Sequence, residues 1–298
     1  MRALLAYGTS TSPVLEEVVS PEFGPGDVRI KVAAAAVNPV DVGVVRGPVR
    51  AAAELPDPVG LGWDVSGTLL EVGASVTGLA PGDRVAGILN VIAHKPAAGT
   101  HAEEAVLPAG AVARVPDGLD LVGAAALPLT ALTAKQALAM LGPAEGRSLL
   151  VTGGAGALGG HALAMAARAG WEVTALARES DAEFVARAGA KILTQLPGPV
   201  YDAVIDAAVL LGSALGAVRD GGTFVGVAPA SPVAPERGIT TDTVFVEPRS
   251  EALADLFELA VKGTVEVRVA GQLPLADAVE AYGKVADGGQ RGRWLLIP

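Results

Sequence analysis

The pattern of apolar and polar positions divides the chain into two stretches with different rhythms. Over residues 1–119, short apolar segments alternate with Gly and Pro, which is typical of a compact, largely antiparallel β domain. The predicted strands are 14–19, 27–37, 65–72, 83–88 and 101–107. Turn signals at 72–78 and 80–85 link strands in the manner of hairpins. We therefore predict a β domain over the first part of the chain.

From Asp120 onward, helical patterns appear and then alternate with strands. The predicted helices are 121–126, 129–141, 157–169, 181–188 and 210–218, and Gly142-Pro143 ends the second of them. The predicted strands are 148–152, 172–177, 191–194, 201–206 and 223–227. This alternation is the βαβ rhythm of a doubly wound parallel sheet, so the fold class is α/β.

The last part of the chain does not continue that rhythm. A Pro-rich loop at 228–236 precedes a predicted strand at 243–246, helices at 249–261 and 275–285, and a final strand at 293–297. Because a terminal strand is out of place in this alternation, we expect it to return to the first domain. The predicted domains are 1–119 together with 264–298, and 120–263.

Residues 148–160, SLLVTGGAGALGG, form an apolar run that breaks into glycines before an alanine-rich helix. Gly154, Gly156 and Gly159 match the dinucleotide fingerprint, in which glycines allow a tight turn, a close pyrophosphate and a helix pressed against a strand. The phosphate would lie at the positive end of the helix. A preceding strand, a following helix and a second strand at 172–177 support a cofactor site. Its expected contacts also include Gly153, Ala157 and Leu158.

The end of the second strand indicates which dinucleotide binds. NAD-specific domains place a carboxylate there to bind the ribose hydroxyls, but this chain reads Leu176-Ala-Arg-Glu-Ser180. Arg178 and Ser180 would hold a 2′-phosphate through charge-assisted hydrogen bonds, which predicts NADPH. Glu179 would oppose the preference for NADPH if its carboxylate turned inward, because the carboxylate would repel that phosphate.

Composition excludes several classes of function. The formal net charge of −10 argues against nucleic acid or an anionic membrane surface as a partner. The chain has no cysteine, and its three histidines lack the spacing of a helical metal pair, so we expect neither disulfides nor a metal site. It shows no signal peptide and no apolar run of about 18 residues, so the expected location is the cytoplasm.

Several short segments occur in a characteristic order along the chain. They are Asn38-Pro-Val-Asp41, Gly62-Trp-Asp-Val-Ser-Gly67, Pro81-Gly-Asp-Arg-Val85, Gly99-Thr-His-Ala-Glu103, Ala124-Ala-Ala-Leu-Pro128, Leu132-Thr-Ala134, the glycine turn, Tyr201-Asp-Ala-Val-Ile-Asp206, Gly221-Gly222 and Gly289-Gln-Arg-Gly-Arg-Trp294. Together they resemble the medium-chain dehydrogenase/reductase superfamily in its zinc-free quinone oxidoreductase branch. The resemblance covers nearly the whole chain. It implies a GroES-like substrate domain, a Rossmann domain and a cleft between them.

The resemblance also implies the chemistry. Zinc-dependent members carry Cys at the position of Asn38 and His at the position of Trp63, just before the acidic residue that matches Asp64. Without a Lewis acid, hydride removal from an alcohol loses its main activation. We therefore predict metal-free hydride transfer from NADPH to a quinone or other α,β-unsaturated carbonyl, where hydrogen bonds suffice to stabilise the oxygen.

Four residues are catalytic candidates: Asn38, Asp41, Asp64 and Thr133. Asn38 would donate its amide N–H to the nicotinamide or the substrate, or it merely starts a turn. Asp41 would bind a cofactor ribose or cap a short helix. Thr133 matches a family threonine that lines the nicotinamide, or it is an ordinary helix residue.

Asp64 has a structural alternative, which we favour: an ion pair with an arginine near the C-terminus, Arg291, that holds the last strand against the first domain. Arg291 and Thr130 are also included among the expected cofactor contacts. His101 stands where relatives often carry an aromatic residue, and it is either a proton donor or, more simply, a packing residue.

Two other functions remain open. An enoyl-thioester reductase of a biosynthetic pathway would need a basic patch for a phosphopantetheine or nucleotide handle, which this acidic chain does not obviously provide. A non-catalytic NADPH-binding protein is permitted because Val42-Gly43 replaces the region where quinone reductases of this type commonly have Tyr. The Ala- and Pro-rich loops at 49–58 and 229–238 suggest a small apolar acceptor. By resemblance we expect a homodimer that pairs the edge strand predicted at 243–246.

Overall fold

Strand β3 (Asp27–Val37) is the longest strand of the computed structural model, which describes residues 1–298. It pairs with β5 (Asp64–Val72), β7 (Glu104–Pro108) and β16 (Arg293–Ile297), all antiparallel. The seven-stranded sheet is completed by β6 (Arg84–Ile88), β8 (Val112–Arg114) and β15 (Val269–Pro274). Alternate residues of β3, Val28, Ile30 and Val32, are buried in an apolar core, as the two-residue period of a strand requires.

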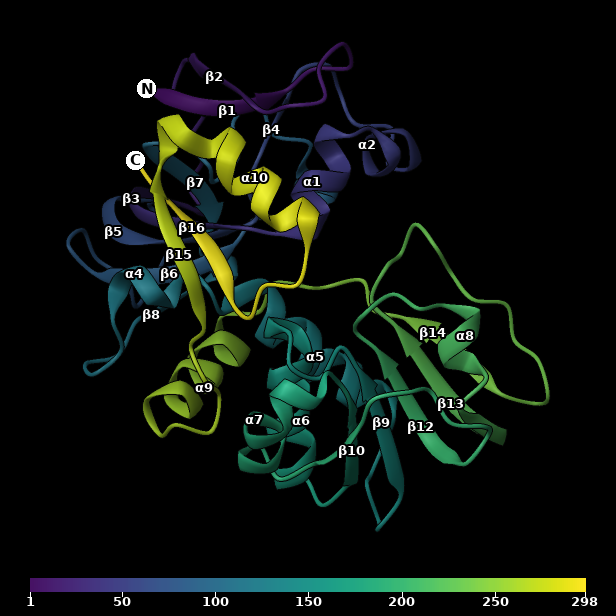
Figure 1. Ribbon diagram of the computed structural model, residues 1–298. Coiled ribbons are helices and arrows are strands. Elements are labelled where there is room, and N and C mark those ends of the chain that lie inside the picture. The colour runs from purple at the N-terminus through teal and green to yellow at the C-terminus, as the bar shows by residue number, and fades with distance from the viewer. The chain divides into compact units, whose positions relative to one another are not determined.

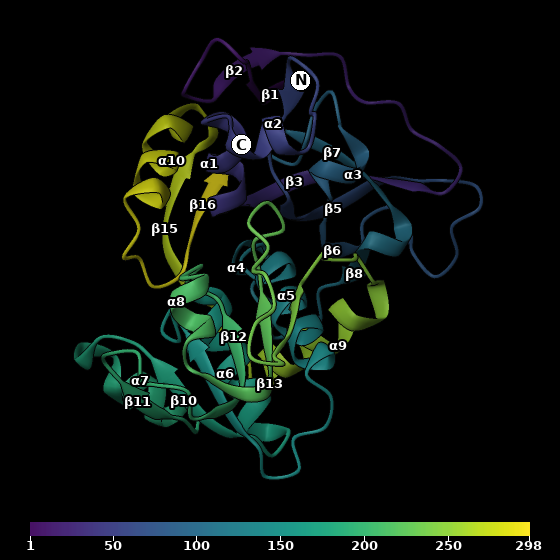
Figure 2. The same ribbon diagram turned by 90° about the vertical axis from the view of Figure 1, so that its right-hand side faces the viewer.

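This sheet belongs to the first of two units into which the chain divides. Unit 1 comprises Met1–Leu129, Glu247–Lys262 and Val267–Pro298. It also holds a small antiparallel sheet of β1 (Arg2–Ala6), β2 (Val14–Glu17) and β4 (Val59–Gly60). Its helices are α1 (Pro39–Val45), α2 (Pro48–Ala52), α3 (Val91–His94), α4 (Leu121–Ala124), α9 (Ser250–Val261) and α10 (Ala278–Asp287). Helix α10 lies beside β15 and β16 in both views (Figures 1 and 2).

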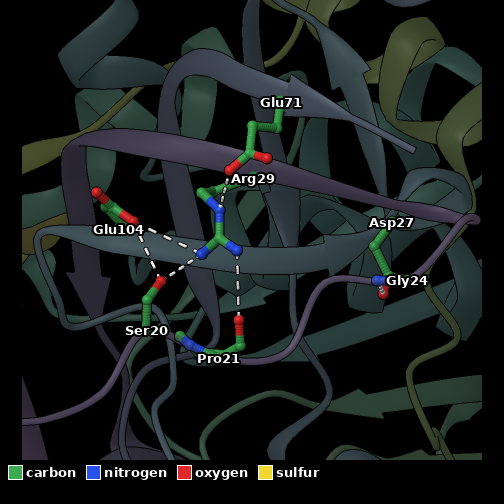
Figure 3. A network of polar contacts seen from close by, with 7 residues as sticks. All are labelled: Ser20, Pro21, Gly24, Asp27, Arg29, Glu71 and Glu104. Carbon is green, nitrogen blue, oxygen red and sulfur yellow. Dashed lines mark hydrogen bonds and ion pairs between the residues drawn. The ribbon is translucent and has the colours of Figure 1, made fainter. Parts of the chain in front are cut away.

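A polar network ties the segment before β3 to the sheet (Figure 3). Arg29 of β3 donates from Nε to Glu71 Oε1 of β5 at 2.6 Å and approaches Glu104 of β7 at 3.6 Å. The same guanidinium donates to the Ser20 hydroxyl and the Pro21 carbonyl. Arg29 therefore has its hydrogen-bonding capacity met by structural partners and is no candidate for binding a ligand.

Unit 2 comprises Thr130–Val246 and Gly263–Glu266 and holds a six-stranded parallel sheet. The order is β11 (Lys191–Leu193), β10 (Glu172–Leu176), β9 (Ser148–Thr152), β12 (Tyr201–Asp206), β13 (Val218–Gly226) and β14 (Thr240–Thr243). In chain order this is 3-2-1-4-5-6, the Rossmann arrangement. Leu149, Leu150 and Val151 are all buried, because helices cover both faces of such a sheet.

The helices of unit 2 follow its strands. They are the greater part of α5 (Pro128–Met140), α6 (Ala157–Arg168), α7 (Ala182–Arg187) and α8 (Gly212–Leu215). Helix α6 packs on β9 and β10, whereas α8 packs on β12 and β13 (Figure 1). None of the helices in the structure is both long and apolar enough to cross a lipid bilayer.

The predicted fold class is confirmed, and so is the return of the last strand, because β16 pairs with β3. Several boundaries differ from the predictions. The edge strand β14 is Thr240–Thr243, not 243–246, since its pairing with β13 ends at Thr243. The helix predicted at 210–218 is only the short α8, and β13 begins at Val218. Strands β1, β4, β8 and β15 were not predicted.

The division into units also differs from the predicted domain boundaries. Helix α4 lies in unit 1 because it packs on β3, β5 and β6, although its sequence follows Asp120. Helix α9 belongs to the same unit because it packs against β8. A helical pattern shows which face of a helix is apolar, but it does not show which sheet that face will cover.

Candidate functional site

The glycine turn of unit 2 joins β9 to α6 as the fingerprint predicts. Gly153 follows β9 with a φ of +59°, a conformation that other residues adopt at a cost. A Cβ on Gly159 would overlap the carbonyl oxygen of Gly153, so only glycine lets α6 approach the turn this closely. A Cβ on Gly154 would lie 2.6 Å from that of Ala175 on β10. Gly156 precedes the first residue of α6, and Ala157 and Leu158 form the start of that helix.

A pocket of about 590 Å³ lies at the carboxyl ends of the central strands. It is lined by Gly153, Leu176, Ala177, Arg178, Glu179, Thr194, Gln195, Leu196, Ala208 and Leu210. These residues follow β9, β10, β11 and β12, so the pocket is the crevice at which ligands bind in sheets of this order. Its volume lies within the range typical of small-molecule sites, which is roughly 300–1,000 Å³.

A buried hydrogen-bond network holds the two sides of this crevice. Thr152, the last residue of β9, donates from Oγ1 to Asp206 Oδ1 at 2.6 Å. Asp206, the last residue of β12, also accepts from the backbone N–H groups of Leu210 and Leu211, at 3.0 and 2.7 Å. Ala208 N–H donates to Thr152 Oγ1 at 3.0 Å. Sequence reasoning missed this network, although a Thr and an Asp ending two parallel strands were a signal for it.

The residues expected at the cofactor ribose are only partly brought together. Arg178 and Glu179 are both exposed, and both line the pocket. Ser180 is exposed on the 3₁₀ turn Glu179–Asp181 and is not among the lining residues. Thr130 and Thr133 are both buried on α5. The guanidinium of Arg178 and the carboxylate of Glu179 therefore border the same pocket, and they have opposite effects on the binding of an anion there.

In unit 1, Asn38 follows β3 and precedes α1, and it is fully buried. Its Nδ2 donates to Asp64 Oδ2 at 2.8 Å and to the Ala36 carbonyl at 3.2 Å. Both amide hydrogens are therefore used, while Oδ1 is buried without a hydrogen-bond partner. This reverses the polarity predicted for Asn38: the atom left for a ligand is an acceptor and not a donor. Two acceptors beside Nδ2 hold the amide in this orientation.

Asp41 and Asp64 are both buried beside Asn38. Asp41 accepts from Asn38 N–H at 2.9 Å and from Gly62 N–H at 3.1 Å, so both its oxygens have backbone partners. That is the helix-capping geometry, since Asp41 is the third residue of α1. Asp64 accepts from Leu129 N–H at 2.6 Å as well as from Asn38. Burial raises the pKa of each carboxyl to about 7, and these hydrogen bonds oppose the rise.

Arg293 is a cation whose charge acts on both of these carboxyls. The Arg293 charge lowers the pKa of both Asp41 and Asp64. Burial lowers the pKa of Arg293 itself, and its Nε has no hydrogen-bond partner. Trp294 pairs with Val37, which sets Arg293 at the end of β3, and Arg291 lies in the bend before β16. The ion pair of Arg291 with Asp64 stays a prediction.

His101 has both ring nitrogens engaged within unit 1. Nε2 lies 3.0 Å from the Ala36 carbonyl, so it carries the hydrogen, and Nδ1 accepts from the Tyr282 hydroxyl at 2.9 Å. Burial lowers the pKa of the imidazole to about 4, which keeps it neutral near pH 7. This supports the packing interpretation, because His101 joins α10 to the end of β3. Sequence reasoning had no signal for Tyr282.

The residues of this chain do not fit a catalytic zinc ion. The positions that would supply thiolate and imidazole carry Asn38 and Trp63, and the chain contains no cysteine. No group of three or more His, Cys, Asp or Glu side chains is arranged to hold a metal. The Trp63 indole N–H is buried without a hydrogen-bond partner, and indole nitrogen is not a metal ligand.

Comparison with known proteins gives consistent likenesses. The model of the alcohol dehydrogenase GroES-like domain matches residues 24–117, and that of a zinc-binding dehydrogenase matches 180–296. The NADPH-dependent alkenal/one oxidoreductase of Arabidopsis thaliana is 32% identical over 235 residues, which are 75% of this chain and 60% of that protein. The chain thus spans about three-fifths of the length of that relative.

Two further likenesses cover nearly the whole chain. A polyketide synthase of Streptomyces halstedii is 33% identical over 304 residues, which are 94% of this chain but 5% of that protein. The solved structure of the quinone oxidoreductase from Coxiella burnetii is 25% identical and superposes with a TM-score of 0.89, covering 100% of this chain and 99% of that one. The fold and the positions of its elements are therefore shared with proteins of known structure.

Proposed function

Because the chain belongs to the medium-chain dehydrogenase/reductase superfamily, we propose that it uses NADPH to reduce a quinone or another α,β-unsaturated carbonyl compound without a metal ion. The observation that carries this proposal is the crevice of unit 2, where the glycine turn and Arg178 line one pocket. The likeness to an alkenal/one oxidoreductase and to a quinone oxidoreductase supports the class of acceptor.

The residues of unit 2 fit a dinucleotide phosphate. Backbone N–H groups at the start of α6 would bind the pyrophosphate, since the absence of side chains at the glycines permits close approach. Arg178 would bind the 2′-phosphate, and Glu179 would weaken that binding. Thr152 and Asp206 connect the ends of β9 and β12 beside the crevice. Because the Asp206 carboxylate is already hydrogen-bonded within the protein, we do not assign it a contact with the ligand.

The nicotinamide supplies a hydride when the cofactor is bound, and the chain's residues must position the acceptor for it. Asn38 Oδ1 would accept a hydrogen bond from an N–H or O–H group of a ligand bound in unit 1, which would satisfy a buried acceptor that otherwise has no partner. Asp64 would keep Asn38 in this orientation through the 2.8 Å hydrogen bond to Nδ2. In this proposal Asp64 is a positioning residue and Asp41 caps α1.

Cofactor choice provides the first prediction. Replacing Arg178 with Ala is expected to weaken NADPH binding about 10- to 100-fold, because a charge-assisted hydrogen bond contributes roughly 1.5–3 kcal/mol, and to leave NADH binding almost unchanged. Glu179→Gln is expected to raise the preference for NADPH several-fold. Titration by cofactor fluorescence measures both. Arg187→Ala is the matched control, since Arg187 is an exposed arginine of unit 2 paired with Glu183. Equal losses for NADPH and NADH would show that Arg178 does not read the phosphate.

The reaction is tested by oxidation of NADPH in the presence of a benzoquinone, a naphthoquinone, an aliphatic enone and a crotonyl thioester, with NADH as the control. Turnover on quinones or enones is the expected result. A preference for the thioester would instead favour the enoyl-thioester reductase, which the likeness to a polyketide synthase keeps as the second candidate. Tight NADPH binding with no turnover on any acceptor would indicate a non-catalytic NADPH-binding protein.

We also propose that the protein forms a homodimer through β14. This strand pairs only with β13, so its other edge presents unpaired backbone groups, and the neighbouring Phe245 is 72% exposed. A second copy of the same edge would satisfy both features. Light scattering after size exclusion is expected to give twice the chain mass, and Thr241→Pro is expected to shift it to the monomer. A monomer in the wild-type protein would refute this assembly.

A further inference from the structure

A second pocket, of about 330 Å³, lies wholly within unit 1 and is separate from the cofactor crevice. One side is the loop after β1, from Tyr7 to Thr11, and the other is the segment that runs from the end of α1 into α2. That second segment contributes Arg46 and Arg50. A pocket with two arginines is unexpected in a chain whose formal net charge is −10.

The two guanidinium groups are incompletely neutralised. Arg50 has a side chain only 12% exposed, and its single ion pair is with Asp57, at 3.3 Å from Nη1. Its Nε and Nη2 are buried without hydrogen-bond partners. Arg46 is exposed and makes no ion pair. Buried N–H donors that lack acceptors are costly, and an arginine fork is well matched to an oxyanion.

The other groups around the pocket are hydroxyls and carboxylates whose partners are known. Thr9, Ser10 and Thr11 place three hydroxyl groups along the loop. Of the nearby acids, Glu16 accepts from the Tyr7 hydroxyl at 2.9 Å, and Asp57 accepts from Gly8 N–H at 3.0 Å. Each carboxylate is therefore already held, and the Ser10 hydroxyl donates to the Ser12 carbonyl at 2.9 Å. This leaves the hydroxyls of Thr9 and Thr11 and the guanidinium groups as donors for a ligand.

We propose that this pocket binds the phosphate group of a phosphate ester. Phosphate offers several acceptor oxygens, which match two guanidinium groups and neighbouring hydroxyls better than a single carboxylate would. The volume of about 330 Å³ exceeds that of one phosphate group, so part of the attached organic group would also be enclosed. Arg46 and Arg50 thus make this pocket locally basic, although the overall composition of the chain is acidic.

The position of the pocket suggests how such a ligand relates to the reaction. Asn38 precedes the seven-residue helix α1 and Arg46 follows it, so eight steps with a rise of about 1.5 Å each separate them by about 12 Å along the helix. An elongated substrate with its reactive end beside Asn38 would carry its phosphate to Arg46 and Arg50. This part of the inference rests on the proposed reductase function, whereas phosphate binding itself does not.

Phosphate binding is tested by calorimetric titration of the full-length protein with inorganic phosphate at constant ionic strength. Wild-type protein is expected to bind, and Arg46→Ala is expected to lower the affinity at least fivefold. Arg46 is exposed, so this variant is expected to fold. Arg249→Ala is the matched control, because Arg249 is an exposed arginine of unit 1, paired with Glu247, that does not line the pocket. Its affinity is expected to equal that of the wild type.

The result that overturns the proposal is equally specific. If phosphate is held instead in the cofactor crevice, Arg178→Ala removes binding and Arg46→Ala does not. The proposal is also overturned if the wild type shows no binding at phosphate concentrations up to about 10 mM, because a site with a millimolar Kd would be detected there. Neither readout depends on enzymatic turnover, so failure here leaves the proposed reductase function untouched.

A kinetic comparison identifies the source of the phosphate. A crotonyl thioester of phosphopantetheine and the same thioester of pantetheine differ only in the phosphate group. If the phosphate belongs to the substrate, Arg46→Ala raises KM for the first thioester at least fivefold and leaves KM for the second unchanged. If KM for both is unchanged while Arg46→Ala still weakens phosphate binding, the pocket binds a separate phosphate ester.

Discussion

Replacing Gly159 with Ala is expected to destabilise the protein by about 2–4 kcal/mol and to weaken NADPH binding at least tenfold. The added Cβ would overlap the carbonyl oxygen of Gly153, and backbone atoms on both sides cannot move aside without shifting the turn. Helix α6 would then be displaced from β9 and β10, together with the backbone groups expected to bind the pyrophosphate. Urea unfolding and cofactor titration measure the two effects.

Gly283→Ala is the matched control for this change. Gly283 lies within α10, and a Cβ there would meet no atom within 4 Å. The same substitution is therefore expected to stabilise the protein by about 0.5–1 kcal/mol, because Ala favours a helix interior over Gly. If the two variants behave alike, the close approach of α6 to the glycine turn does not occur in solution.

Replacing Asn38 with Asp is expected to destabilise the protein by about 3–5 kcal/mol near pH 8. The new carboxylate would stand where Nδ2 now donates to Asp64 at 2.8 Å, so an attraction becomes a repulsion between buried like charges. The change in side-chain size is minimal, which separates this electrostatic effect from a packing effect. Urea unfolding between pH 5 and pH 8.5 measures it.

The pH dependence of this effect has a definite sign. A carboxyl whose pKa is higher in the folded than in the unfolded protein binds more protons when folded, so its contribution to stability falls as pH rises between the two values. Asp41 and Asp64, with pKa raised from 3.8 to about 7, already impose such a fall on the wild type. Asn38→Asp adds a third carboxyl and makes the fall steeper, so its destabilisation is expected to diminish toward pH 5.

Asn90→Asp is the control for this second prediction. Asn90 caps α3 by accepting from Ala93 N–H at 3.0 Å, and Asp caps a helix as well as Asn does. Its stability is therefore expected to stay within about 0.5 kcal/mol of the wild type across the same pH range. If Asn38→Asp has the same free energy of unfolding as the wild type, with the same dependence on pH, the contact between Asn38 and Asp64 is not formed.

The sequence by itself determined the parts of this protein that depend on local pattern. The run from Ser148 to Gly160 predicts a buried strand, a glycine turn and a helix, because glycine at Gly153 and Gly159 is required by backbone geometry within a few residues. The alternation of strands and helices predicts a doubly wound parallel sheet. Arg178 could be placed at the edge of the sheet where its pocket lies, because it follows a strand of the same alternation.

The tertiary structure alone decided which distant groups meet. Asn38 presents an acceptor because Asp64, 26 residues away, and Ala36 take both of its amide hydrogens. The charge of Arg293 acts on Asp41 and Asp64 because the register of β16 on β3 places this arginine at the strand end. Arg46 and Arg50 line one pocket with Thr9 and Thr11 only after two short sequence segments fold together. Such pairings depend on the register and the packing of segments that are far apart in the chain, and local periodicity determines neither.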